Sequence, residues 1–136
     1  EAALREQLLD KYGWHSISTR IRLQSHQGYD SINSYDRIDP NYLRVWFDFI
    51  YGNMYPRGII DDRTRLLVMV GICLALNEPV QLENHMRGAL LLGATPREVL
   101  EVIVQSTAYV GMPTTVLTGR MLERIAKEEN RLAELT

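Results

Sequence analysis

His85 is the residue of this 136-residue chain whose side chain best suits proton transfer near neutral pH. If the surrounding segment is helical, the residues one turn away on either side are Gln81, Leu82, Gly88 and Ala89. The last two are small and leave space beside the imidazole, either for a closely packed helix or for a ligand. Two interpretations stay open: a core histidine bonded to a backbone carbonyl, or a general acid or base in a small pocket.

Arginine is the second residue type that could take part in binding or catalysis, because the chain has 13 Arg and only 2 Lys. Arg63 and Arg65 follow Asp61 and Asp62 at the start of an expected helix. Cations are unfavourable beside a helix N-terminus, so another interaction must hold these two arginines. They form salt bridges to Asp61, Asp62 or a neighbouring subunit, or they clamp a carboxylate, which a guanidinium binds through two parallel hydrogen bonds.

Aromatic residues are concentrated between positions 46 and 55. An aromatic stripe at helical spacing usually belongs to a core. Tyr51, Asn53, Tyr55 and Arg57, however, lie where the expected helix ends, so their polar tips could also point into a cleft. Tyr109 precedes a second helix break, at Gly111 and Pro113. This break either only ends the helix or forms part of the same site.

The chain offers few metal ligands and one thiol. Cys73 is the single cysteine, which excludes an internal disulfide, a CxxC pair and a cysteine-based zinc site. The histidines, at 15, 26 and 85, have no i,i+4 ligand spacing, and the first two are weaker catalytic candidates. We expect neither a metal nor a cofactor.

The overall charge and hydropathy limit the classes of partner. The formal net charge of −2 argues against bulk electrostatic binding of nucleic acid. No apolar run approaches the ~20 residues that a membrane-spanning helix needs, and the N-terminal residues show no signal-like apolar core. We therefore expect a cytoplasmic protein with no nucleic-acid or membrane partner.

Helix signals recur along most of the chain. Asp39 before Pro40, Asp61, and Thr95 before Pro96 are expected N-caps, and Glu98 completes a capping box with Thr95. The expected helices are 2–12, 40–54, 61–76, 78–92, 95–110 and 113–131, with a polar arm over 14–39. The sequence thus predicts an all-α fold of about six helices: an N-terminal helix and arm over 1–39, and a helical region over 40–136, in one domain overall.

Two of these helices are apolar on nearly every side, which is more apolar surface than a chain of this length easily covers. Self-association into a homo-oligomer is the economical explanation.

Three segments together resemble the carboxymuconolactone decarboxylase family. Residues 51–57 followed by 61–65 resemble its aromatic-Gly…Arg…Asp-x-Arg-Thr-Arg stretch. Residues 85–98 resemble its His-x-Arg-x-Ala…Gly-x-Thr…Glu helix, and 105–113 its Gln…Tyr-x-Gly-x-Pro segment. The resemblance implies an all-helical bundle of this family, which is shared with the AhpD-type proteins. It also implies assembly into an oligomeric ring, from a dimer up to a hexamer.

The chain also departs from two patterns within that family. Glu78 and Gln81 occupy the positions of the two cysteines of alkylhydroperoxidase-type members, so we expect no thiol peroxidase activity. The small γ-carboxymuconolactone decarboxylases, which are the nearer match, usually carry acids at the positions of Gln81 and Asn53, and Trp at those of Tyr51 and Tyr55. An amide keeps hydrogen bonding but cannot donate a carboxylic proton.

The resemblance implies a cofactor-independent, decarboxylase-like carbon–carbon lyase that acts on a small carboxylated lactone or enolisable ring acid. His85 is then the catalytic acid or base, and the expected substrate-binding residues are Arg57, Arg63, Arg65, Tyr109, Tyr55, Asn53 and Gln81. Two alternatives remain. One is an isomerase, cyclase or dehydratase on the same scaffold that releases no CO2, and the other is a non-catalytic oligomeric binding protein.

Overall fold

The computed structural model describes residues 6, 10 and 37–136. Apart from residues 6 and 10, the predicted helix over 2–12 lies outside this part, as do most of the predicted arm over 14–39, His15 and His26. The described residues form helices and turns without a strand, which confirms the all-α fold class. The chain divides into two compact units, residues 1–60 and 61–136.

The described part of the first unit begins with α4 (Pro40–Phe47). Its N-cap is Asp39, whose side chain accepts hydrogen bonds from the Asn41 and Tyr42 N–H groups at 2.9 and 3.2 Å, as predicted. The expected single helix over 40–54 is wrong in its second half. There the chain winds into a π-helix, η1 (Asp48–Met54), followed by a 3-10 turn, η2 (Tyr55–Arg57).

The π-helix aligns residues five apart instead of four. Trp46 and Tyr51, which are five residues apart, meet edge to face with ring centroids 5.6 Å apart, whereas Tyr51 and Tyr55, which are four residues apart, stack at 5.7 Å. Both tyrosines are buried. Phe47, Tyr51 and Tyr55 of the aromatic stripe therefore belong to the core of this unit, whereas Phe49 is 65% exposed.

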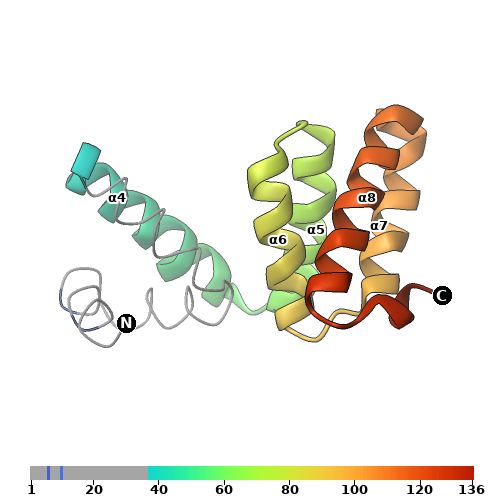
Figure 1. The fold of residues 1–136 in the computed structure, drawn as a ribbon. Coiled ribbons are helices and arrows are strands. Elements are labelled where there is room, and N and C mark those ends of the chain that lie inside the picture. Colours follow the sequence, from blue (N-terminus) through green and yellow to red (C-terminus); the bar gives the residue numbers. More distant parts are fainter. Residues whose placement is uncertain (1–5, 7–9, 11–36) are drawn as a thin grey trace. The chain divides into compact units, whose positions relative to one another are not determined.

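The second unit is a bundle of four helices: α5 (Asp62–Ala75), α6 (Pro79–Leu91), α7 (Pro96–Val110) and α8 (Met112–Glu128). Figure 1 shows them side by side, each antiparallel to the next along the chain, with α5 packed on α6 and α7, and α8 on α7. A short 3-10 turn, η3 (Leu132–Leu135), ends the chain. The core of the second unit consists of apolar side chains from all four helices: Leu66, Val70, Leu74, Leu82, Met86, Ala89, Val99, Ile103, Leu122, Ile125 and Ala126.

The helix boundaries follow local capping signals. Asp61 accepts a hydrogen bond from the Thr64 N–H at 2.7 Å and begins α5, and Thr95 with Glu98 forms the predicted capping box of α7. α8 ends at Glu128, three residues before the predicted end. Beyond it, Arg131 turns back and donates to the carbonyls of Leu90 and Ala94 at 3.4 and 3.2 Å.

Candidate functional site

His85 lies in the middle of α6 and is 8% exposed, so its imidazole is among the few buried polar side chains of the second unit. Buried polar groups need hydrogen-bond partners, so the position of this imidazole depends on the residues packed around it. Gly88, one turn further along, is also buried. The sequence predicted a small residue beside the His85 ring. This residue, Gly88, lies inside the bundle and not on its surface.

The helical repeat of 3.6 residues per turn divides α6 into a core stripe and two borders. Leu82, Met86 and Ala89 form the buried stripe. Glu83 and Arg87 lie along one border. His85, which is about 160° to 200° around the helix from both of them, lies along the other. Side chains on the two borders therefore point away from the helix axis in nearly opposite directions.

Gln81 shares the border of His85, one turn closer to the start of α6, and its side chain is exposed. The two residues are i,i+4 neighbours, which suits one amide and one imidazole acting on the same small molecule. The helix confirms their expected spacing one turn apart. The resemblance placed an acid at position 81; here the exposed group there is neutral.

Arg63 is engaged within the protein. Its guanidinium forms an ion pair with Glu98, the residue that also completes the capping box of α7. Glu98 Oε2 accepts from the Thr95 N–H at 2.8 Å. Hydrogen bonds from Arg63 and then from the Thr95 backbone lower the pKa of Glu98 to about 2. Of the two sequence interpretations of Arg63, the intramolecular salt bridge is thus present, although with Glu98 and not with Asp61 or Asp62.

The ion pair between Arg63 and Glu98 also shows which helix ends meet. Both residues lie in first turns, so α5 and α7 begin at the same end of the bundle. Tyr109 is eleven residues beyond Glu98 on α7, or about 16 Å along the helix axis. It is 87% exposed at the opposite end. Arg63 and Tyr109 of one chain therefore lie too far apart to hold the same small substrate. Arg65 lies half-buried in the first turn of α5.

The three remaining site candidates belong to the first unit. Tyr55 is buried, whereas Arg57 and Asn53 are exposed. The Asn53 amide donates to the backbone carbonyl of Asp48 at 2.5 Å, five residues back, and so helps to close the π-helix. Asn53 thus has a local structural contact in addition to any role in binding.

Cys73 is buried on α5, and this burial raises the pKa of its thiol. Among the described residues, no three His, Cys, Asp or Glu side chains gather as a metal site would require. No helix in the same part of the chain is long and apolar enough to cross a membrane.

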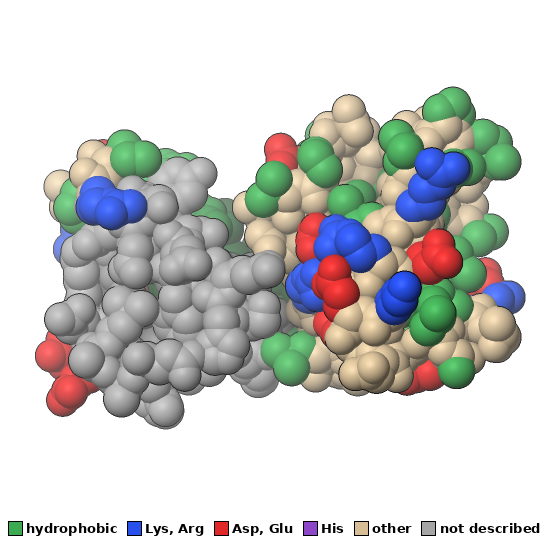
Figure 2. Space-filling model, in the orientation of Figure 1, with side chains coloured by type: hydrophobic (Ala, Val, Ile, Leu, Met, Phe, Trp, Pro, Cys, Tyr) green, Lys and Arg blue, Asp and Glu red, His purple; other side chains and the backbone are tan. Residues whose placement is uncertain are grey.

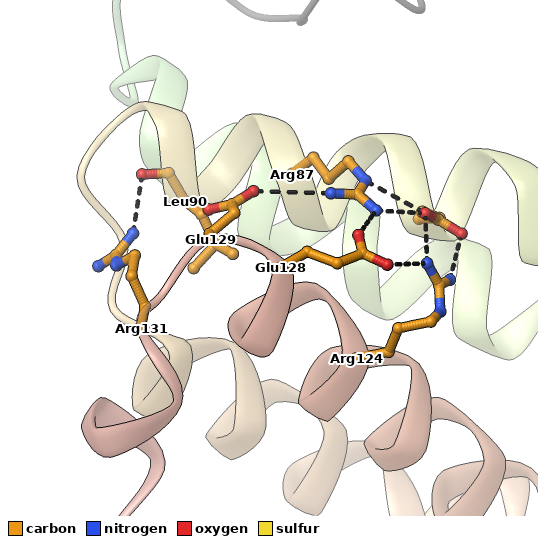
Figure 3. A network of polar contacts seen from close by, with 7 residues as sticks. Arg87, Leu90, Arg124, Glu128, Glu129 and Arg131 are labelled. Atoms are coloured by element: carbon orange, nitrogen blue, oxygen red, sulfur yellow. Dashed lines mark hydrogen bonds and ion pairs between the residues drawn. The ribbon is translucent and has the colours of Figure 1, made fainter.

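Sequence reasoning missed the polar network in which Arg87 takes part (Figure 3). Arg87 and Glu83 of α6 interact with Arg124 and Glu128 of α8, and Glu129 lies 3.8 Å from Arg87. The available signal was the i,i+4 spacing of opposite charges in Glu83–Arg87 and in Arg124–Glu128. Nothing local indicated that the two pairs would meet across 41 residues of sequence.

Comparison with known proteins was made against family models and curated sequences. The model described as "Carboxymuconolactone decarboxylase family" matches residues 40–119. A 4-carboxymuconolactone decarboxylase of Acinetobacter baylyi is 25% identical over 114 residues, covering 82% of this chain and 83% of that protein. An uncharacterised 15.0 kDa protein of Paracoccus denitrificans is 34% identical over 96 residues, 68% of each chain. A nitrosuccinic acid decarboxylase of Metarhizium robertsii is 26% identical over 69 residues, 51% of this chain and 48% of that one.

Proposed function

Because the chain belongs to the carboxymuconolactone decarboxylase family, we propose that it is a lyase that removes CO2 from a small carboxylated lactone or another enolisable acid. The observation that carries the proposal is His85: a buried imidazole inside the matched region, with an exposed amide one turn away. Two of the relatives carry the name of a decarboxylase, and the substrates in those names are both organic acids.

The proposed reaction needs three things from the protein: a cation near the carboxylate that stays, an apolar surface beside the one that leaves, and an acid for the carbon. As the bond to the leaving carboxylate breaks, its electron pair enters the conjugated carbonyl or nitro group of the substrate, and CO2 departs. The imidazolium of His85 then donates its proton to the carbanionic carbon. The substrate is its own electron sink, so no cofactor is needed.

The remaining candidates bind and orient the substrate in this proposal. Gln81 donates a hydrogen bond from beside His85, and Arg65 supplies positive charge for the second carboxylate. For Arg57, which belongs to the first unit, a binding role rests on the family resemblance alone. Arg63 enters this proposal with its guanidinium already ion-paired to Glu98. Tyr109, Tyr55 and Asn53 act as orienting donors, and Tyr109 meets a substrate held by Arg63 only if the two residues come from different copies of the chain.

Self-association accompanies this function. Val68 and Ile72 of α5 and its C-cap residue Leu76 lie at i,i+4 spacing. They are 49%, 45% and 72% exposed, so they form one apolar stripe on the second unit. A stripe of this kind is costly in water and favours contact with another copy of the chain. Such contact also brings groups from two chains into one site.

The test is direct measurement of CO2 release from 4-carboxymuconolactone and from nitrosuccinic acid, with native protein and with His85→Gln. We expect the variant to be at least ~100-fold slower, which is the usual contribution of general acid–base assistance. Arg97→Met, on the outer side of α7, is the matched control and should keep native activity.

Full activity of His85→Gln would remove the assignment. Consumption of either acid without CO2 would favour an isomerase, cyclase or dehydratase instead. Saturable binding without any turnover would favour a non-catalytic binding protein.

A further inference from the structure

Four side chains join α6 to α8 in a continuous ion-pair cluster, which we call the α6–α8 clamp: Glu83, Arg87, Arg124 and Glu128 (Figure 3). Arg124 binds both oxygens of Glu83, with Nη2 to Oε2 at 2.6 Å and Nη1 to Oε1 at 3.2 Å. Arg87 donates to Glu83 Oε1 from Nε at 3.1 Å and from Nη2 at 2.8 Å, and the same Nη2 also reaches Glu128. Each carboxylate therefore receives bonds from two arginines.

The clamp differs from an ordinary surface ion pair. The α6 side chains Arg87 and Glu83 are only 16% and 24% exposed, and the α8 side chains Arg124 and Glu128 are 48% and 46% exposed. The side chains of the Arg97–Glu101 pair on α7 are 57% and 60% exposed. The hydrogen bond from Arg124 and, after it, that from Arg87 lower the pKa of Glu83. Networks with bidentate geometry and reduced exposure restrict motion, whereas isolated exposed pairs contribute little. Figure 2 shows the charges gathered over α6 and α8 on this face of the second unit.

The clamp lies on the border of α6 opposite to that of His85, with the buried stripe of Leu82, Met86 and Ala89 between them. The close packing of these aliphatic side chains fixes α6 through shape alone, without directional bonds. Bidentate hydrogen bonds to a second helix are directional. A rotation of about 10° would move a ring that lies roughly 5–6 Å from the helix axis by about 1 Å.

We propose that the α6–α8 clamp sets the rotation of α6 and thereby places the His85 imidazole for proton transfer, which makes Arg87 a positioning residue. This role rests on the proposed function of His85. A displacement of about 1 Å in a reacting group can slow a reaction by about 10²-fold. Substitution of Arg87 removes its contacts to Glu83 and Glu128 but leaves the bidentate pair of Arg124 with Glu83, so the clamp is weakened and not abolished. This weakening should reduce kcat and leave KM nearly unchanged, since Arg87 does not lie on the border that carries His85.

The experiment compares native protein, Arg87→Met and Arg87→Lys by NMR of the histidine ring protons, with the His85 signals assigned from their loss in His85→Gln. In Arg87→Met we expect displaced His85 ring signals and, on whichever of the two acids releases CO2, a kcat at least ~10-fold lower. Arg87→Lys keeps one charge contact to the carboxylates and should recover part of both. Glu128→Gln is the milder variant to use if Arg87→Met does not fold.

Two controls separate positioning from general destabilisation. Arg97→Met makes the same substitution in the exposed pair on α7, and Ile103→Val lowers stability from the buried face of α7. Both should leave the His85 signals in place. Unmoved His85 signals in Arg87→Met, or moved signals with native kcat, would overturn the proposal. If neither acid releases CO2 with native protein, the proposed function fails, while the ring signals still decide whether the clamp places His85.

Discussion

Thr95→Ala should lower the stability of the second unit by a predictable amount. Thr95 Oγ1 accepts a hydrogen bond from the Glu98 N–H at 3.1 Å and so satisfies one of the free backbone donors at the start of α7. The alanine variant loses this acceptor but keeps the backbone N–H of residue 95, which donates to Glu98 Oε2. Removing an N-cap hydroxyl typically costs about 1 kcal/mol of unfolding free energy.

The corresponding change in melting temperature follows from the size of the unit. Residues 61–136 fall in the range of 60–100 residues, for which 1 kcal/mol shifts Tm by about 4–8 °C. Thermal unfolding followed by far-UV circular dichroism at pH 7 should therefore show a loss of that size. Thr95→Ser, which keeps the hydroxyl, is the matched control and should melt close to the native temperature.

Two outcomes would refute this reasoning. If Thr95→Ala melted within one degree of the native protein, the capping box would contribute no stability. If the serine variant lost as much as the alanine variant, the cost would come from the methyl group and not from the hydrogen bond.

Two further predictions follow from the same unit. The folded-state pKa of Glu98 is about 2, below its ordinary value of 4.5, so the stability it contributes is complete above about pH 4.5 and is lost as the pH falls towards 2. The Tm difference between native protein and Glu98→Gln should therefore be constant from pH 7 to 5 and shrink below 4.5; a constant difference down to pH 2 would contradict this linkage. Ile72→Glu places a charge in the apolar stripe of α5 and should reduce the assembly mass measured by light scattering after size exclusion, whereas Ala133→Glu, near the chain end, should not. Equal masses for native protein and Ile72→Glu would exclude this stripe as an interface.

Local signals in the sequence predicted the start of three helices correctly. Asp39, Asp61 and Thr95 each bond a backbone N–H two or three residues ahead, so the whole cap lies within one turn of chain. The apolar periodicity likewise placed the four helices of the second unit within a few residues of their observed bounds. Such interactions need no knowledge of the rest of the molecule.

The π-helix over 48–54 was not predictable in this way. Apart from Met54, its residues are middling or weak helix formers, and their types do not distinguish a π-helix from an α-helix. The choice between the two depends on how the rings of Trp46, Tyr51 and Tyr55 pack, with centroid separations of 5.6 and 5.7 Å. Packing of buried rings is a tertiary property, so the pattern alone predicted one continuous helix.

The same distinction between local sequence and tertiary packing applies to the candidate site. Residue types and motif spacing were enough to select His85, to exclude a CxxC pair and to predict an all-helical fold, since these depend on composition and on neighbours along one helix. Burial of the His85 ring, neutralisation of Arg63 by Glu98 and the meeting of Arg87 with Glu128 required the folded chain. The partners in the last two contacts are 35 and 41 residues apart, and only the packing of one helix against another brings such distant charges within hydrogen-bonding range.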